Sequence, residues 1–128
     1  MERVAEHFAQ ILDTARSNSW VRNEDLTFRE IDENEGYIRG TLYLHGGCAL
    51  HISEYVEIKN GRAKCIKYRY QLQDRKEELL ARWDNAPHHK EIATFPNHKH
   101  RRDGEIVPSP EMNIFLILSL MDDILKND

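Results

Sequence analysis

The feature of this chain that most constrains its fold is a pair of alternating segments joined by Asn60 and Gly61. Apolar side chains recur at every second position on both sides of that dipeptide: Leu50, Ile52, Val56 and Ile58 before it, and Ile66, Tyr68, Tyr70 and Leu72 after it. A period of two is typical of a strand with one buried face, and Asn-Gly favours the positive φ angles of a tight hairpin turn. The sequence therefore predicts an antiparallel hairpin over residues 50–72.

Weaker alternation predicts three more strands, over residues 25–31, 37–44 and 77–83. Near the N-terminus, helical spacing of apolar residues predicts a helix over residues 2–16; those residues are Val4, Phe8, Ile11, Leu12 and Ala15. The predicted fold is α+β: an antiparallel β-meander of about five strands with an N-terminal and a C-terminal helix packed on it. The length suits a single domain of residues 1–128.

The C-terminal helix is predicted over residues 112–125, with Ser109 as its N-cap and Pro110 in its first turn. Ten of those fourteen residues are apolar, which is more than one helix face needs to cover a sheet. The residues expected on the sheet are Phe115, Leu118 and Leu125, and those expected on the first helix or a second chain are Leu116, Leu120 or Ile124. A homodimer through this helix is therefore one of two interpretations.

Charge is unevenly distributed along the chain. Residues 61–102 carry 11 Lys/Arg against 5 Asp/Glu, whereas residues 1–60 carry 6 against 11 and residues 103–128 carry 1 against 6. A basic centre in an acidic protein indicates one place for an anionic ligand, although a charge run is often only a solvated face.

The chain carries no sign of export. No apolar run reaches the roughly 18 residues of a membrane span, and the acidic N-terminus lacks the apolar core of a signal peptide. Cys48 and Cys65 stand singly, with no CxxC pair. These features predict a reduced, cytoplasmic protein.

The basic centre coincides with a dense block of chemically active side chains. It holds four of the seven histidines, which are His88, His89, His98 and His100. Imidazole exchanges protons near neutral pH, and Arg and Lys bind phosphate. On the strand that enters the block, Arg82 and Asp84 share one face while Trp83 faces the core. In an extended segment, His98 and His100 also share a face, opposite Lys99.

Glu54 interrupts the apolar row of residues 50–58, so its carboxylate is expected to point inward or into a cleft. A buried carboxylate must pair with a cation, accept hydrogen bonds, or titrate near neutral pH. Two interpretations stay open. Glu54 is either a functional acid or base in one cleft with Tyr68, Arg82 and the histidines, or the partner of a structural ion pair with Arg69 or Arg82.

Tyr68, Arg69 and Tyr70 form an aromatic–basic–aromatic triplet on the second strand of the hairpin. Sheets that bind single-stranded RNA use strand aromatics to stack bases. Tyrosine is also common in strands for packing reasons alone, so core packing is the competing interpretation.

The four histidines raise the question of zinc. No cysteine joins them, and the adjacent pair His88 and His89 lacks the spacing typical of zinc ligands. A carboxylate such as Asp84 or Glu54 could complete an open catalytic site, but the spacing favours a site without a metal or other cofactor. The sequence has no P-loop, G-x-G-x-x-G or nucleophile elbow, which argues against kinase, dehydrogenase and serine hydrolase chemistry.

Two motifs in this block resemble those of the TumE-type toxins of bacterial and archaeal type II toxin–antitoxin systems. Residues 82–89 read R-W-D-N-A-P-H-H and resemble R-x-D-N-x-P-H-H, and residues 95–100 read F-P-N-H-K-H and resemble F-P-x-H-K-H. The Tyr-Arg-Tyr triplet and the Val-Pro-Ser before the last helix stand in the same order, so the resemblance spans about residues 50–125. It implies a small cytoplasmic toxin with a partner antitoxin, often one with a helix-turn-helix domain. Asn97 departs from the pattern, in which a further histidine is expected.

The residues and the resemblance together predict a toxin that binds RNA and cleaves it as a metal-independent endoribonuclease. A general base takes the ribose 2′-hydroxyl proton, and a general acid protonates the leaving 5′-oxygen. The residues predicted for catalysis are His88, His98, Glu54, Arg82 and Lys99. Those predicted to contact RNA are Tyr68, Tyr70, Asp84, Asn85, His89, His100, Arg101 and Arg102. The alternatives are a non-catalytic module that binds RNA or protein, and a metal-dependent nuclease built on the histidines.

Overall fold

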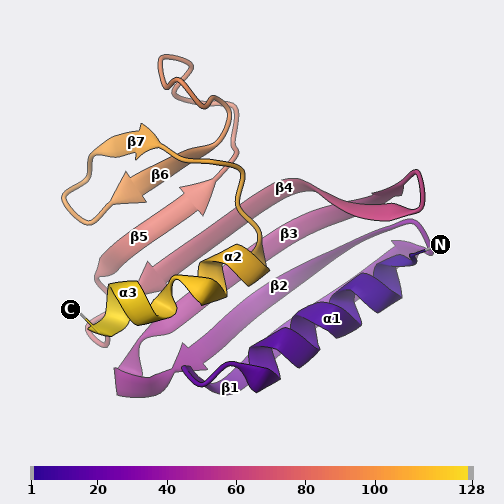
Figure 1. Cartoon of the computed structure of the whole chain (residues 1–128), viewed down its shortest axis with the longest axis horizontal. Coiled ribbons are helices and arrows are strands. Elements are labelled where there is room, and N and C mark those ends of the chain that lie inside the picture. Colours follow the sequence, from indigo (N-terminus) through magenta and orange to yellow (C-terminus); the bar gives the residue numbers. More distant parts are fainter. Residues whose placement is uncertain (1, 127–128) are drawn as a thin grey trace.

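The computed structural model describes residues 2–126, which form one antiparallel sheet with helices on one side (Figure 1). The strands are β1 (Val21–Asp32), β2 (Glu35–Leu44), β3 (Ala49–Lys59), β4 (Arg62–Gln73), β5 (Leu79–Asp84), β6 (His98–Arg101) and β7 (Ile106–Pro108). They lie side by side in the order of the sequence. The helices are α1 (Val4–Ser17), α2 (Ile114–Ser119) and α3 (Met121–Lys126), and a 3-10 turn, η1 (His45–Gly47), joins β2 to β3. The predicted α+β meander is confirmed.

The hairpin of β3 and β4 forms as predicted, because its turn residues adopt the backbone angles that the sequence indicates. Asn60 has φ 53° and Gly61 has φ 75°, and a two-residue hairpin turn of type I′ needs positive φ at both positions. Alternate residues are buried from Leu50 to Val56 in β3 and from Tyr68 to Leu72 in β4. A β-bulge opposite Tyr55 and Val56 takes Ile66 out of the predicted buried row, so Cys65 packs against the core in its place. One face of the sheet is therefore apolar and the other polar.

All three helices cover the apolar face (Figure 1). The helical side chains buried there are Val4, Phe8, Ile11 and Ala15 of α1, Ile114, Ile117 and Leu118 of α2, and Met121 of α3. The buried sheet residues that form one cluster with them include Ile38, Leu42, Leu50, Ile52, Val56, Tyr68, Tyr70, Leu72 and Trp83. The spacing of the α1 residues follows the helical turn, so a single stripe of its surface reaches this core.

The opposite face of the sheet carries polar and charged side chains, and within residues 2–126 no helix covers it (Figure 1). Cross-strand partners point to the same face, so the pairing register defines which side chains gather there. One row crosses the sheet from β2 to β6 through Arg39, Ser53, Arg69, Asp84 and His98. We refer to this polar surface as the open face.

Some details of the predicted elements are wrong. The sheet has seven strands rather than about five, because the chain after β5 adds strands of 4 and 3 residues, too short to show a sequence period. The C-terminal helix is broken at Leu120 into α2 and α3. Its N-cap is Asn113, whose side chain accepts a hydrogen bond from the Leu116 N–H, and not Ser109. Among the described residues, no helix is long and apolar enough to cross a membrane.

The wide apolar surface of the C-terminal helices is only partly buried. Leu118 is buried as predicted, whereas the ring of Phe115 is half-buried and meets His7 of α1. Leu116 is 45% exposed and, with Leu120, lines a groove of about 340 Å³. Contact of this groove with a second chain stays a prediction.

Candidate functional site

A pocket of about 270 Å³ lies on the open face where β4, β5, β6 and the β5–β6 connection meet. Its lining is basic and rich in histidine: Lys67, Tyr68, Arg69, Arg82, Asp84, Ala86, His88, His89, His98 and His100. The four histidines of the predicted block therefore converge with Arg82 and Asp84. We refer to this site as the histidine pocket.

Strand register assembles the pocket. On β5, Trp83 is buried toward the helices, so Arg82 and Asp84 on either side of it face the open face. In the pairing of β5 with β6, Asp84 lies opposite His98 and Arg82 lies opposite His100. Directly opposite side chains in an antiparallel pair have Cβ atoms about 5 Å apart. Two residues of each strand thus bring a carboxylate, a guanidinium and two imidazoles together.

Asp84 is at the centre of this group. Its Oδ1 atom lies 2.9 Å from His98 Nε2, and its Oδ2 atom lies 3.3 Å from both His100 Nε2 and Arg82 Nε. Arg82 Nε makes no hydrogen bond, so its attraction to Asp84 is Coulombic. Asp84 is only 7% exposed, so water screens these interactions weakly. The carboxylate therefore holds the three neighbouring groups in place.

His98 is held on both sides of its ring. Its Nδ1 atom lies 2.9 Å from the carbonyl oxygen of Pro96, and its Nε2 atom faces Asp84. A carbonyl and a carboxylate both accept hydrogen bonds. Both contacts therefore form together when both ring nitrogens carry protons, or when another cation lies between Nε2 and the carboxylate. The His98 side chain is 2% exposed, so almost none of its ring is open to solvent.

His100 lies closer to solvent than His98. Burial lowers the pKa of its imidazole, the Arg82 guanidinium lowers it further, and the Asp84 carboxylate opposes both. The Arg82 Nη2 atom lies 3.0 Å from His100 Nε2. The ring therefore favours the neutral form, in which it can accept a proton.

The β5–β6 connection supplies the other two histidines. His89 has φ 59°, a conformation that residues with side chains rarely adopt and that is found disproportionately at functional sites. Its ring centroid lies 5.1 Å from that of His98 and 5.8 Å from that of His100. His88 is exposed at the rim of the pocket. Both could therefore meet a ligand that enters from solvent.

Three of these side chains could hold a metal ion. Nitrogen atoms of His89, His98 and His100 lie within 4.8 Å of one another. The Pro96 carbonyl orients the His98 ring from outside, as carbonyl groups do around metal-bound histidines. Asp84 could add a carboxylate oxygen, and such a donor set suits zinc or another divalent transition metal. The pocket thus offers acid–base chemistry and metal binding at one place.

Asn85, which the motif places among the RNA-contacting residues, is engaged by the backbone. Its side chain accepts a hydrogen bond from the Tyr68 N–H and donates one to the Ile66 carbonyl, both at 3.0 Å. These two bonds extend the pairing of β5 with β4 by one residue, because Asp84 is the last residue of β5. Its position supports a structural role in the sheet.

Glu54 faces the helices, so the cleft predicted to join it with Arg82 and the histidines is wrong. It is 2% exposed, and its Oε1 atom accepts a hydrogen bond from the Tyr70 hydroxyl at 2.7 Å. Burial raises the pKa of this carboxyl group, and the bond from Tyr70 partly opposes the shift. The ion pair considered with Arg69 or Arg82 does not form, because both side chains lie on the open face.

Tyr68 and Tyr70 belong to the core, as the competing interpretation of the triplet holds. They are 2% and 0% exposed, and their rings stack with centroids 5.3 Å apart. The Tyr68 hydroxyl donates a hydrogen bond to Asn97 Oδ1 at 2.8 Å, which ties β4 to the β5–β6 connection. Burial raises the pKa of Tyr68 to about 12. Neither ring is exposed enough to stack an RNA base, so that prediction is wrong.

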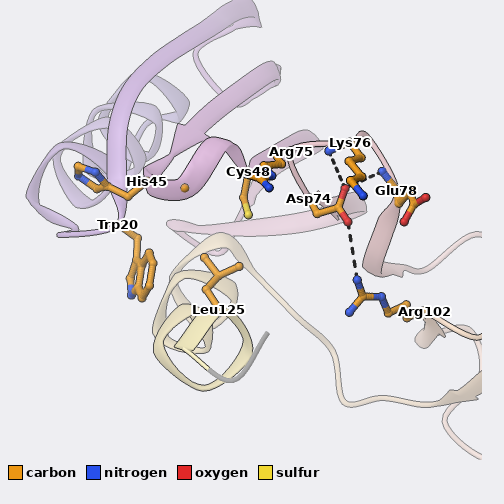
Figure 2. Close-up of a pocket in the computed structure, with 10 residues that line it drawn as sticks. Trp20, His45, Cys48, Asp74, Arg75, Lys76, Glu78, Arg102 and Leu125 are labelled. Atoms are coloured by element: carbon orange, nitrogen blue, oxygen red, sulfur yellow. Dashed lines mark hydrogen bonds and ion pairs between the residues drawn. The ribbon is translucent and has the colours of Figure 1, made fainter.

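Three cations of the predicted site do not line the histidine pocket. Lys99 points to the covered side, where its Nζ atom lies 5.3 Å from the centre of the Trp83 ring. Arg101 forms ion pairs with carboxylates of the β6–β7 turn. Arg102 lies 3.7 Å from Asp74 at a separate pocket of about 460 Å³, where η1, the β4–β5 turn and α3 meet (Figure 2).

Two residues of the histidine pocket, Lys67 and Arg69, were not predicted as site residues. Arg69 was noted only as the middle residue of the Tyr-Arg-Tyr triplet. Both are exposed and line the histidine pocket. The alternation of β4 carried the necessary information: once Tyr68 and Tyr70 are assigned to the core, Lys67 and Arg69 must face the other side. These two residues supply positive charge that Lys99, Arg101 and Arg102 do not bring to the pocket.

Comparison with known proteins agrees with the motifs. The family model described as Toxin TumE matches residues 8–126. That range contains all the strands of the sheet and all the histidines of the pocket. No curated protein and no solved structure matches the chain. The match extends far beyond the two motifs, and the chain therefore belongs to the TumE toxin family, the toxin components of toxin–antitoxin systems.

Proposed function

We propose that this toxin acts in the cytoplasm by cleaving RNA at the histidine pocket. The observation that carries the proposal is the group of imidazoles and a guanidinium around Asp84, beside the exposed cations Lys67 and Arg69. Cleavage through the ribose 2′-hydroxyl needs a base, an acid and positive charge near phosphorus, and the pocket has residues for all three. An antitoxin, expected from the resemblance to carry a helix-turn-helix domain, would neutralise the activity.

In the proposed reaction, neutral His100 removes the proton from the 2′-hydroxyl. The 2′-oxygen forms a bond to phosphorus, and the bond between phosphorus and the 5′-oxygen breaks. His89, or His88 at the rim, gives a proton to that oxygen, so the products are a 2′,3′-cyclic phosphate and a 5′-hydroxyl. Arg82 and Lys67 stabilise the added negative charge at phosphorus. The carboxylate of Asp84 and the buried imidazole of His98 hold His100 and Arg82 in position.

Growth and RNA cleavage test this proposal together. Induced expression without the antitoxin should arrest growth, and His100→Ala or His98→Ala should relieve the arrest at an equal level of soluble protein. Purified wild-type protein should cleave RNA, and His100→Ala should slow cleavage by about 100-fold or more, because general acid–base catalysis contributes about 10²–10⁴-fold. His45→Ala is the matched control, since His45 is an exposed histidine outside the histidine pocket.

Two results would count against RNA cleavage. Normal growth while folded wild-type protein accumulates would exclude toxicity under these conditions. Growth arrest with RNA binding but no RNA cleavage would indicate instead a non-catalytic toxin that acts by occupying its target.

The same pocket supports a second candidate, a metal-dependent nuclease. The observation that favours it is the approach of His89, His98 and His100 to within 4.8 Å, with a carboxylate beside them. A divalent ion held there would activate a water molecule for attack on phosphorus. Cleavage that persists in a chelator supports the metal-free mechanism. Cleavage that stops in a chelator and returns with Zn²⁺ or Mn²⁺ supports the metal-dependent one.

A further inference from the structure

We infer that the open face holds a second binding site, a platform for unpaired RNA bases formed by Tyr37 and Tyr55, which leads the RNA strand into the histidine pocket. This inference rests on the proposed RNA substrate and specifies its form as single-stranded. A hollow of about 490 Å³ lies over β2, β3 and β4, and its lining includes Tyr37, Arg39, Tyr55, Lys67 and Arg69. That volume is in the range of small-ligand pockets.

The two tyrosines form the aromatic part of the hollow. The register places Tyr37 on β2 directly opposite Tyr55 on β3, so both lie on the open face. Both are half-buried, unlike the fully buried tyrosines of β4. The Arg39 Cζ atom lies 4.9 Å from the centre of the Tyr37 ring and adds a flat cation to this surface. Unpaired bases stack on tyrosine rings and on guanidinium planes.

Charge around the hollow sets the path of the RNA backbone. On one side of the tyrosines, Arg39 and Arg69 are exposed in the row that crosses the sheet. On the other side, the Tyr55 hydroxyl contacts the Glu35 carboxylate and lies 3.3 Å from that of Glu57. Phosphate is attracted to the first side and less so to the second, where Glu57 already forms an ion pair with Lys59 at 3.4 Å. The backbone therefore follows the arginines while the bases lie over the rings.

The hollow is continuous with the histidine pocket. Lys67, Tyr68 and Arg69 of β4 line both. The row that contains Arg69 continues to Asp84 and His98 at the centre of the pocket. Adjacent strands are about 4.8 Å apart, so three strand spacings separate the platform from the pocket by about 14 Å. A strand of a few nucleotides reaches both, with one base on the tyrosines while a phosphate lies at the histidines.

The platform selects single strands. Stacking on a tyrosine needs a base with a free face, and bases inside a duplex already stack on their neighbours on both faces. A duplex would therefore gain only the contacts of its phosphates with the arginines. Single-stranded RNA gains both kinds of contact.

Binding of a fluorescent 2′-O-methyl oligoribonucleotide, measured by anisotropy, tests the platform without cleavage, because this probe lacks the nucleophilic hydroxyl. The wild-type protein should bind the single strand more tightly than a duplex of the same sequence. Tyr55→Ala should weaken binding of the single strand about ten-fold, the usual size of a lost stacking contact. Tyr55→Phe, which keeps the ring, should bind like the wild type. Tyr43→Ala is the matched control, since Tyr43 is 46% exposed on the same face of β2 but outside the hollow.

Three results overturn the inference: wild-type affinity in Tyr55→Ala, equal loss in Tyr55→Phe, or equal binding of duplex and single strand. If thermal melting shows that Tyr55→Ala is unfolded, the Arg39→Glu variant is measured in its place. The inference is then overturned if Arg39→Glu binds the single strand as tightly as Tyr43→Ala does. Cleavage of unmodified RNA is measured separately. A Tyr55 effect on binding without any cleavage by the wild type leaves the platform standing and removes the nuclease proposal.

Discussion

Two buried carboxylates of this protein have opposite surroundings. Asp84 has two imidazoles and a guanidinium within 3.3 Å. Glu54 accepts a hydrogen bond from Tyr70, and its Oε2 atom has no hydrogen-bond partner. A buried carboxylate without a cation is costly when it ionises. At the residue scale, therefore, Glu54 is a place where pH acts on the stability of the fold rather than on the site.

Glu54→Gln should change how stability depends on pH. The pKa of Glu54 is raised in the folded protein above its usual value of 4.5, so folding is favoured by this group below that pH. The contribution is lost as the pH rises through the folded pKa. We expect the wild-type free energy of unfolding to fall above pH 4.5 by up to about 1.4 kcal/mol per pH unit, and Glu54→Gln to lack most of this fall. Urea unfolding at acidic and alkaline pH measures the difference.

Glu57→Gln is the control for that experiment, because Glu57 lies on the same strand but is only half-buried. This variant should keep the fall in stability above pH 4.5 that is assigned to Glu54. Parallel profiles for Glu54→Gln and the wild type would show that the buried carboxyl group does not couple pH to folding.

The Asn85→Ala variant tests whether this motif residue stabilises the fold or contacts RNA. The substitution leaves the Tyr68 N–H and the Ile66 carbonyl without their partners, so the free energy of unfolding should fall by about 1–3 kcal/mol. Asn23→Ala should change it by less than about 0.5 kcal/mol, because Asn23 is exposed and its side chain accepts a hydrogen bond from the adjacent Glu24 N–H. Unchanged stability with weaker RNA binding in Asn85→Ala would reverse the assignment.

At the scale of elements, the short strand β6 carries two pocket residues on only 4 residues of chain. It is placed by β5 and β7 on either side and by the connection before it. In that connection, the Thr94 hydroxyl donates to the Asn97 carbonyl at 2.6 Å and accepts from the Ser109 N–H at 2.9 Å. The Tyr68 hydroxyl bonds to the Asn97 side chain. Hydrogen bonds from three segments thus position β6, whereas longer strands are positioned by the packing of their alternating apolar side chains.

The start of α2 gives a prediction about a single element. Asn113 accepts a hydrogen bond from the Leu116 N–H at 2.9 Å, and an N-cap of this kind stabilises a helix by about 1 kcal/mol. Asn113→Ala should therefore lower the free energy of unfolding by about that amount, measured by thermal or urea unfolding, whereas Asn113→Ser should largely keep it. Equal losses in both variants would mean that the side chain contributes by packing and not by capping.

At the scale of the whole molecule, the sheet divides the protein into a covered face that stabilises it and an open face available to a ligand. The open face carries exposed cations from separate strands, among them Arg39, Lys67 and Arg69. Because these cations would each displace a counterion from RNA, binding should weaken as salt rises. The steepness with which RNA affinity falls as salt rises shows how many of these cations contact phosphate.

Titration of RNA affinity against salt measures that number. Each contact with a single strand contributes about −0.7 to the slope of log affinity against log salt. The Arg39→Ala and Arg69→Ala variants should each make the slope less negative by about that amount. Arg16→Ala should leave it unchanged, because Arg16 lies on α1 and pairs with Glu24 at 2.9 Å. A wild-type slope near zero would contradict phosphate binding on the open face.

The sequence by itself determined the elements that form through interactions between residues near one another in the chain. The period of two, the Asn60-Gly61 turn and the spacing on α1 depend on neighbouring residues, and all three appear as predicted, except that a β-bulge in β4 removes Ile66 from the buried row. The same local logic placed Trp83 in the core and put His98 and His100 on one face. The histidines of the motif block also lie together in one pocket, because they lie on two adjacent pieces of chain.

Only the tertiary structure decided which faces of different strands meet. Parity within β3 predicted that Glu54 points inward, but the register of β4 against β5 placed Tyr70 beside Trp83 and so turned Arg82 away from Glu54. The same register left Lys67 and Arg69 on the side of the histidines, and it buried the tyrosines expected to stack RNA. A shift of one residue exchanges the two faces of a strand. Register between strands depends on turns, bulges and packing across the whole sheet, which a local pattern does not contain.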